Sequence, residues 1–311
     1  MSPLERATAF APASVGNVAI GFDILGFSVE ALGDRVTVSR RAARGVEISA
    51  VDGIPGELAR EPRDNTAGKA LLALIEALEP DFGLTVQIHK GIPLGSGLGG
   101  SAASAVAAVV AANALLAQPC PLPTLLKFAA AGEAVASGGR HMDNIAPSLY
   151  GGLVLTVGID EPRVKQIPVP AGVRAVVVHP HMFLATSKAR AILRASVQLS
   201  DFVWQTANLA GFISACYTND LDMLRASFED VVIEPQRAAL IPGFQDVRRS
   251  AMQAGALGCS ISGAGPAMFA WASTATAPLV QAAMQREFAR HGLKSDGWCV
   301  ELSPRGARVL E

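Results

Sequence analysis

A run of glycines is the part of the sequence best suited to chemistry. Residues 91–113 read GIPLGSGLGGSAASAVAAVVAAN, so five glycines lead into Ser101 and Ser104 and a long block of alanine and valine. Glycine is costly to order and packs no side chain, so such a cluster indicates a backbone that a ligand approaches closely. The free N–H groups and positive dipole end of a following helix favour an anion. The segment therefore predicts a phosphate site, with both hydroxyls as further donors.

Better-known glycine motifs fit this segment poorly. Gly95, Gly97 and Gly100 match GxGxxG, but a dinucleotide site also needs an acidic residue about 20 positions later. No Asp or Glu occurs between Asp81 and Glu133. No GK[ST] follows the glycines, and the DFG at 81–83 lies upstream of them, where it cannot serve a protein kinase. The structural alternative is a serine that caps a packed helix.

The elements that must position this loop follow from hydrophobic periodicity. Helical spacing predicts helices at 65–78, 122–137 and 196–217, and alternating or short apolar runs predict strands at 34–40, 83–89, 151–158, 173–180, 257–261, 267–271 and 298–302. The glycine loop then lies between a strand and a buried helix. The Pro-rich segment 160–172 is the best candidate for a domain junction. We predict an α+β protein with two domains, residues 1–165 and 166–311.

Composition limits the partners of the chain. With 26 Lys+Arg, 27 Asp+Glu and a net charge of −1, nothing suggests nucleic acid. The apolar run 102–117 is interrupted and too short to cross a bilayer comfortably, so no membrane is expected. The four cysteines form no CxxC pair, which predicts free thiols in a reducing cytoplasm. His179 and His181 lack a nearby third ligand, so HPH is predicted to be a strand end.

Several motifs resemble one family of enzymes. PLGSGLGGSAAS at 93–104 resembles the phosphate-binding motif of the GHMP small-molecule kinases, usually PxxxGLGSSAA. Within that group the homoserine kinases are the closer resemblance, carried in order by APASVGNVAIGFDILG (11–26), RDNTAG (63–68), GRHMDNIAPSLYGG (139–152), TSKARAILR (186–194), EPQRAALIPGF (234–244) and ISGAGPAMFA (261–270). The resemblance implies a two-domain GHMP kinase fold, with an N-terminal ribosomal-protein-S5-like ATP-binding domain and a C-terminal ferredoxin-like α/β sandwich. One departure is Gly100, where the family usually has a serine.

The resemblance also implies a reaction, the transfer of phosphate from ATP to the side-chain hydroxyl of L-homoserine in threonine biosynthesis. Phosphoryl transfer needs a phosphate cradle, a metal and a clamp for the acceptor. The expected cofactor is Mg²⁺, bound by Glu133 with Ser101 beside it. Glu133, Ser101 and Asn144 are the implied catalytic residues. Implied ATP contacts are Asn65 at the adenine, then Pro93, Leu94, Gly95, Ser96, Gly97, Leu98, Gly99, Gly100, Ser101 and Ser104.

The acceptor site is implied by the remaining motifs. The expected contacts to homoserine are Asn17, Asp23, His141, Asn144, Arg190, Arg237 and Gly263. In this assignment Asn17 and Asp23 meet the amino-acid head, and the two arginines grip the carboxylate. Asn144 lies near the acceptor hydroxyl, which an amide orients without taking its proton. Asp143 is either a general base or, as we slightly favour, the cap of the helix that follows.

Two other functions stay open. A different GHMP kinase would phosphorylate mevalonate or a sugar, and a ligand-binding regulator would keep the fold without catalysis. Gly100 is the feature that favours a regulator, whereas Glu133, Ser101, Arg190 and Arg237 favour an enzyme. ATP and L-homoserine are the expected small-molecule partners, and a homodimer is the assembly that we consider.

Overall fold

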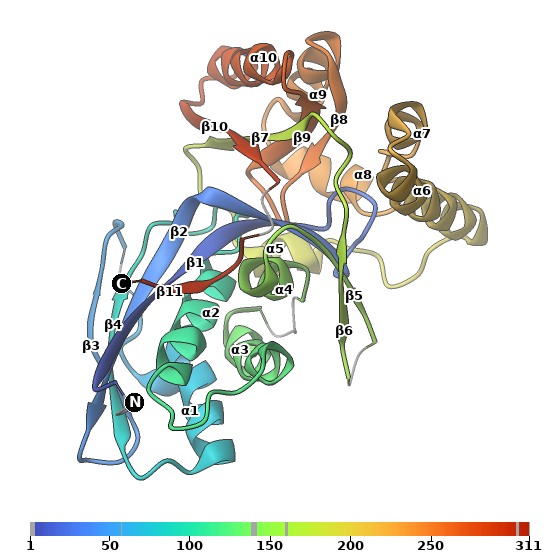
Figure 1. Ribbon diagram of the computed structural model, residues 1–311. Coiled ribbons are helices and arrows are strands. Elements are labelled where there is room, and N and C mark those ends of the chain that lie inside the picture. The colour runs from blue at the N-terminus through green and yellow to red at the C-terminus, as the bar shows by residue number, and fades with distance from the viewer. Residues whose placement is uncertain (1–3, 57, 138–141, 159–160, 303–304, 311) are drawn as a thin grey trace.

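The computed structural model describes residues 4–56, 58–137, 142–158, 161–302 and 305–310. Two β-sheets organise these residues, with helices packed against each sheet (Figure 1). The larger sheet contains β1 (Arg6–Gly16), β2 (Leu25–Arg41), β3 (Val46–Asp52), β4 (Gly83–His89), β5 (Leu153–Val157), β6 (Arg163–Ile167) and β11 (Arg308–Leu310). The smaller sheet contains β7 (Val173–Pro180), β8 (Ala256–Ile261), β9 (Met268–Ser273) and β10 (Ser295–Glu301). This mixture of helices and strands agrees with the predicted α+β class.

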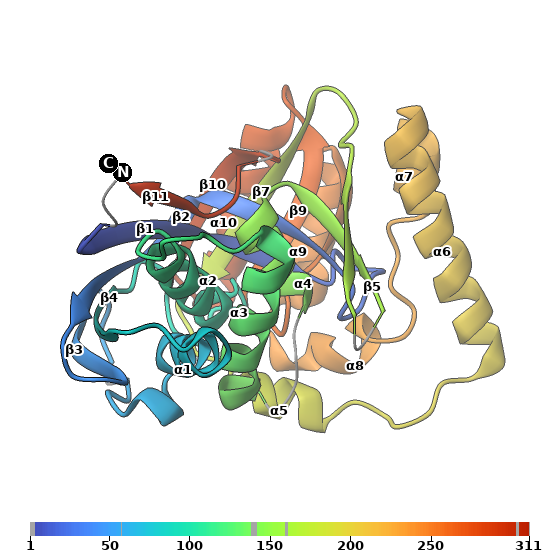
Figure 2. The same cartoon turned by 60° about the horizontal axis from the view of Figure 1, so that its bottom comes forward.

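The helices form a layer on each sheet, as Figures 1 and 2 show. The larger sheet carries α1 (Thr66–Leu78), α2 (Gly100–Asn113), α3 (Leu122–Ser137) and α4 (Met142–Tyr150). The rest of the chain adds α5 (Thr186–Ala191), α6 (Leu199–Thr218), α7 (Leu221–Ala226), α8 (Glu234–Arg237), α9 (Phe244–Gln253) and α10 (Ala277–Arg290). Most residues of α2 are buried alanines and valines, whose small side chains fit a helix enclosed between the sheet and its neighbours.

An aromatic cluster joins the two sheets. Phe27 of β2 lies edge-on to Phe269 of β9, with ring centres 5.5 Å apart, and to Trp271 of the same strand at 6.1 Å. Phe212 of α6 completes the cluster at 5.2 Å from Trp271. All four side chains are fully buried, and each such pair contributes about 0.5–1.5 kcal/mol beyond its area. The cluster therefore fixes the two halves of the chain against each other.

The predicted elements agree with the structure where a local pattern decides them. The intervals 83–89, 122–137 and 173–180 coincide with β4, α3 and β7. His179 is the next-to-last residue of strand β7, as predicted, and all four cysteines are free. Among the described residues, no helix combines the length and apolar character needed to cross a membrane.

The segment 160–172, predicted to join the two domains, is not all linker, because part of it forms a β-strand. Within 160–172 the structure places β6, which pairs with β5 in the larger sheet. The chain reaches the smaller sheet only at β7, so the predicted boundary after residue 165 falls inside β6 and stays a prediction. Strand β11, near the C-terminus, returns to the larger sheet and pairs with β1.

Candidate active site

The glycine-rich segment forms the loop between β4 and α2, as predicted. Gly95, Gly97 and Gly99 have φ values of 61°, 79° and 67°, a region that disfavours other residues. A Cβ on Gly97 would also lie 2.6 Å from the carbonyl oxygen of Ser262. Gly99 is the N-cap of α2 and makes no side-chain cap, so the alternative of a serine cap is wrong. The helix start thus keeps backbone N–H groups for an anion.

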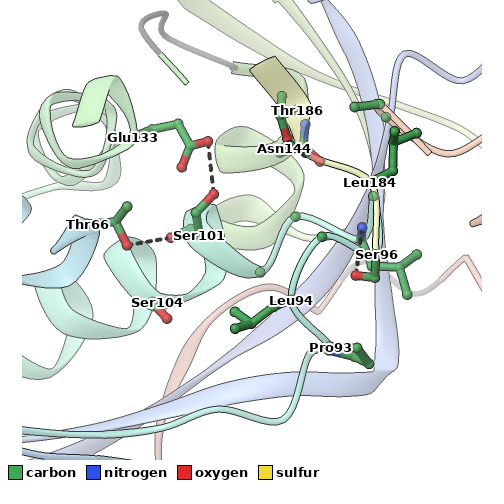
Figure 3. A pocket seen from close by; sticks show the side chains of 18 of the residues that line it. Thr66, Pro93, Leu94, Ser96, Ser101, Ser104, Glu133, Asn144, Leu184 and Thr186 are labelled. Carbon is green, nitrogen blue, oxygen red and sulfur yellow. Dashed lines mark hydrogen bonds between the residues drawn. The ribbon is translucent and has the colours of Figure 1, made fainter. Parts of the chain in front are cut away.

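Glu133 of α3 faces the start of α2 (Figure 3). Ser101 Oγ donates a hydrogen bond to Glu133 Oε1 at 3.0 Å, and Thr66 Oγ1 donates to the carbonyl oxygen of Ser101 at 3.2 Å. The Glu133 residue is only 5% exposed, so it is not a solvated helix charge. A buried carboxylate and a hydroxyl beside a phosphate cradle offer the oxygen ligands that Mg²⁺ prefers. These two residues therefore fit the expected metal.

A buried ion pair, which the sequence analysis missed, braces both ends of the loop. Asp34 of β2 accepts hydrogen bonds from Ser104 Oγ at 2.6 Å and from the backbone N–H groups of residues 91 and 92. Lys90 Nζ donates to Asp34, to Ser104 Oγ at 2.8 Å and to the carbonyl oxygen of Gly100 at 2.7 Å. Ser104 thus belongs to the brace as well as to the cavity wall. The one sequence feature that indicates this ion pair is Lys90, which directly precedes the glycine-rich segment.

Gly100, the departure from the family motif, lies against this brace. A Cβ on Gly100 would lie 3.2 Å from the Ile92 side chain and 3.5 Å from Lys90 Nζ. A serine there would push the tightly held Ile92 aside. Glycine at this position therefore suits the local packing, which weakens it as evidence for an inactive regulator.

The turn between β1 and β2 forms the opposite end of the site. Asn17 and Asp23 have φ values of 68° and 62°, which are uncommon for residues with a side chain and often occur at functional sites. Asn17 Oδ1 accepts from the Asp23 N–H at 3.0 Å, and Asn17 Nδ2 donates to the carbonyl oxygen of Gly263 at 2.9 Å. The Asn17 N–H donates to Asp143 Oδ2 at 3.1 Å. Asp143 lies inside α4, so its predicted role as the cap of that helix is wrong.

Two arginines converge on this turn from the other half of the chain. Arg190 of α5 pairs with both carboxylate oxygens of Asp23, at 3.1 and 2.6 Å. Arg237 of α8 donates to the carbonyl oxygen of Gly263 at 3.0 Å, and it is 3% exposed. Burial lowers the pKa of Arg237, and both guanidinium carbons lie 5.3 Å from the ring centre of Phe22. Two cations beside one carboxylate can bind an anion and still orient an ammonium group.

Asn144 lies between the two ends of the site. Its Oδ1 accepts a hydrogen bond from Ser14 Oγ at 3.0 Å, and a Cβ on Gly99 would come within 3.0 Å of the same oxygen. Asn65 caps α1, because its side chain accepts from the N–H groups of residues 67 and 68. His141 lies outside the described residues.

One cavity of about 570 Å³ brings these groups together. Every other predicted site residue lines it, from Asn17 and Asp23 through the glycine loop, Glu133 and Asn144 to Gly263. Phe183, Leu184 and Thr186 also line it and were not predicted. Its volume is in the ordinary range of about 300–1,000 Å³ for small-molecule sites. A phosphate cradle with a carboxylate lies at one end of the cavity and paired cations lie at the other, so the cavity can hold a phosphate donor beside a small anionic acceptor.

Comparison with known proteins shows the family to which the chain belongs. Residues 65–152 match the GHMP kinases N terminal domain, and residues 212–290 match the GHMP kinases C terminal family. The homoserine kinase of Xanthomonas campestris pv. campestris (strain B100) is 48% identical over 312 residues, covering 99% of this chain and 95% of that protein. The homoserine kinase of Xylella fastidiosa (strain M12) is 47% identical, covering 98% and 94%.

Solved structures show the same fold. The crystal structure of homoserine kinase from Cytophaga hutchinsonii matches with a TM-score of 0.96 and 41% identity, covering 100% of this chain and 99% of that one. The fold is that of a GHMP kinase, a class of phosphotransferases. Within that class, the chain belongs to the homoserine kinase family. The L. major mevalonate kinase, with a TM-score of 0.69 and 19% identity, shares the fold alone.

Proposed function

We propose that this chain transfers the γ-phosphoryl group of ATP to the side-chain hydroxyl of L-homoserine, forming O-phospho-L-homoserine for threonine biosynthesis. The observation that carries the proposal is the single cavity shared by the glycine loop, Glu133, Asn144 and the two arginines. ATP phosphates lie along the loop and the start of α2, where backbone N–H groups and the helix dipole favour negative charge. Asn65 lies at the adenine end.

The metal role follows from the donor groups. Glu133 with Ser101 would hold Mg²⁺, which would supply positive charge to the transferring phosphates. The 3.0 Å hydrogen bond from Ser101 Oγ keeps the carboxylate next to the first turn of α2. The remaining catalytic contribution of the chain is to position the two reactants next to each other in one cavity.

The acceptor is oriented by charge. Arg190 and Arg237 bind the homoserine carboxylate, while Asp23 attracts its ammonium group. Asn144 then orients the hydroxyl toward the γ-phosphate. Its amide cannot take the proton, which passes to the phosphate or to water. A sugar offers no carboxylate to the two arginines, and mevalonate offers no ammonium group to Asp23. The four free thiols suit a reducing cytoplasm as the place of action.

The test is ADP release with Mg²⁺-ATP and a panel of L-homoserine, L-serine, mevalonate and galactose. L-homoserine is expected to give much the largest kcat/KM. L-serine lacks one methylene and should fall roughly 10- to 200-fold below it. A preference for mevalonate or galactose would contradict the proposed substrate, and no turnover with any alcohol would favour a regulator.

A further inference from the structure

Arg237 is held at both ends of its side chain. Its Nε donates to the carbonyl oxygen of Ala189 in the neighbouring helix α5, at 3.1 Å, and its Nη1 donates to the carbonyl oxygen of Gly263 at 3.0 Å. Asn17 Nδ2 donates to the same Gly263 oxygen at 2.9 Å. These contacts fix the guanidinium. The backbone end depends on α8, which is only four residues long, and a helix of a single turn is unstable by itself.

The side chain of Asp230 stabilises the start of α8. Its Oδ1 accepts hydrogen bonds from the backbone N–H groups of Val232 and Ile233, each at 2.9 Å, and its Oδ2 accepts from the N–H group of Glu234 at 2.8 Å. The first N–H groups of a helix have no partner within the helix, so a carboxylate that accepts them stabilises its first turn. Ile233, the residue at the N-cap position, makes no side-chain cap. Asp230 therefore fixes the place where α8 begins, three residues before Arg237.

The Asp230 carboxylate is also a buried charge close to Arg237. Asp230 is 6% exposed, and both residues line a small cavity of about 10 Å³, roughly the room that a single water molecule needs. Burial raises the pKa of Asp230, while its three backbone hydrogen bonds lower it. Burial lowers the pKa of Arg237, and the negative charges of Asp23, Asp143 and Asp230 oppose this shift. Because buried charges are little screened by water, Asp230 favours a cation at this position.

Gln205 of α6 connects the segment before α8 to the turn between β1 and β2. Its Oε1 accepts a hydrogen bond from the N–H group of Val231 at 3.0 Å, and its Nε2 donates to the carbonyl oxygen of Ile20 at 3.0 Å. Ile20 belongs to the turn that carries Asp23. The segment that places Arg237 is thus joined to the turn that places Asp23, so the two opposite charges keep a fixed separation.

We propose that Asp230 is a positioning residue for the acceptor site: its buried carboxylate fixes the start of α8 and so holds the Arg237 guanidinium where the acceptor carboxylate binds. This inference rests on the proposed function, in which Arg237 binds that carboxylate. Asp230 acts through Arg237, so its loss lowers the fraction of molecules in which Arg237 is in place. The apparent affinity for the acceptor falls with that fraction.

Substitutions of Asp230 test this role through the KM of each substrate. Asp230→Ala removes the hydrogen bonds and the charge, so the KM for L-homoserine should rise about tenfold or more, while kcat and the KM for ATP should change less than about twofold. Asp230→Asn keeps the shape of the side chain and one acceptor oxygen but loses the charge. It should raise the KM for L-homoserine by a smaller factor, about threefold.

Asp220→Ala is the matched control. Asp220 is exposed and caps α7 in a similar way, because its Oδ1 accepts from the N–H groups of Asp222 and Met223 at 3.1 and 2.9 Å. The control should lose some stability, which thermal melting measures, and should leave kcat and both KM values unchanged. It therefore separates the loss of a helix cap in general from the loss of the position of Arg237.

A double variant shows whether Asp230 acts through Arg237. Arg237→Met removes the guanidinium and keeps much of the side-chain volume. In a chain that already carries Arg237→Met, adding Asp230→Ala should raise the KM for L-homoserine less than about twofold further, because the group that Asp230 positions is already gone.

Three results would overturn the proposal. The first is an unchanged KM for L-homoserine in Asp230→Ala, and the second is an equal rise in the KM of both substrates, as a general loss of folding would give. The third is a double variant in which the effects of the two changes multiply. If Asp230→Ala does not fold, Asp230→Asn is judged by the same three results.

Failure of the proposed function gives a different result. If Arg237→Met alone leaves the KM for L-homoserine unchanged, Arg237 does not bind the acceptor, and both the assignment and this inference are wrong. If Arg237→Met raises that KM but Asp230→Ala does not, the role of Asp230 alone is wrong.

Discussion

The two ends of the cavity bind charge by different means. At the end that we propose for the nucleotide, the groups available to a ligand are backbone N–H groups held by glycines and by the buried Asp34–Lys90 brace. At the end that we propose for the acceptor, they are charged side chains, Asp23, Arg190 and Arg237, which come from distant parts of the chain. Backbone groups recognise any phosphate of suitable shape, whereas a set of side chains can be matched to one acceptor. We therefore propose that the reaction common to the class depends on the first end and that substrate choice depends on the second.

Glu133→Gln tests the nucleotide end with the largest expected effect. The change keeps the size of the side chain but removes the charge that binds the metal, so kcat should fall roughly 10²-fold or more. Turnover is measured across a range of Mg²⁺ concentrations. Ser101→Ala should be milder, because the carboxylate stays. Glu79→Gln, at the exposed C-terminal end of α1, serves as the control. If turnover of Glu133→Gln depends on Mg²⁺ concentration as turnover of the parent does, Glu133 does not bind the metal.

Gly97→Ala tests whether the backbone of the loop is what binds ATP. The left-handed conformation costs other residues about 1–2 kcal/mol, and here the new Cβ would also meet backbone atoms, so the KM for ATP should rise about 30-fold. Gly45→Ala is the matched control, with φ of 92° and no atom within 4 Å of a Cβ. If both variants bind ATP equally well, close approach at Gly97 is not needed.

Arg237→Lys and Arg190→Lys test the acceptor end. A lysine keeps the charge but cannot form two parallel hydrogen bonds to a carboxylate. The KM for L-homoserine should rise about tenfold or more, equivalent to about 1.4 kcal/mol, with little change in the KM for ATP. Arg225→Lys, on an exposed pair with Asp222, should change neither constant. If the KM for ATP rises instead, the arginines contact ATP and their assignment to the acceptor is wrong.

Glu234 tests the acceptor end through stability rather than through turnover. It begins α8, the helix that carries Arg237, and burial raises the pKa of its carboxyl to about 7 from 4.5. Between these values the native state keeps a proton that the unfolded state loses, so stability is fully present below about pH 4.5 and falls as the pH rises through 7.

The loss at high pH is about 3 kcal/mol, from the shift in pKa. Glu234→Gln should lack this dependence, so urea unfolding of variant and parent should diverge in favour of the variant between pH 5 and 8. A constant difference across that range would show that Glu234 does not titrate there. The nucleotide end, in Gly97→Ala, should show no such pH dependence relative to the parent.

The local sequence pattern determined several helices and strands of this protein and its glycine-rich loop. Alternation with period 2 and helical spacing depend only on near neighbours, which is why β4, β7 and α3 coincide with the predicted intervals. The glycine loop could also be predicted, because a β-strand, a glycine cluster and a small-residue helix follow one another directly. The motifs then led to the family, and through it to Glu133, Asp23 and the two arginines.

Tertiary structure decided how those residues meet. Asp23 and Arg190 are 167 positions apart, and only the packing of the two sheets through Phe27 and Trp271 brings them to one cavity. The Asp34–Lys90 brace and the return of β11 to β1 likewise join distant segments. The periodicity of nearby residues cannot predict such contacts. Their free energy comes from burial and charge pairing that exist only once the chain has folded. The same holds for Asp143, whose contact with Asn17 spans 126 positions and replaces the helix cap that local sequence suggested.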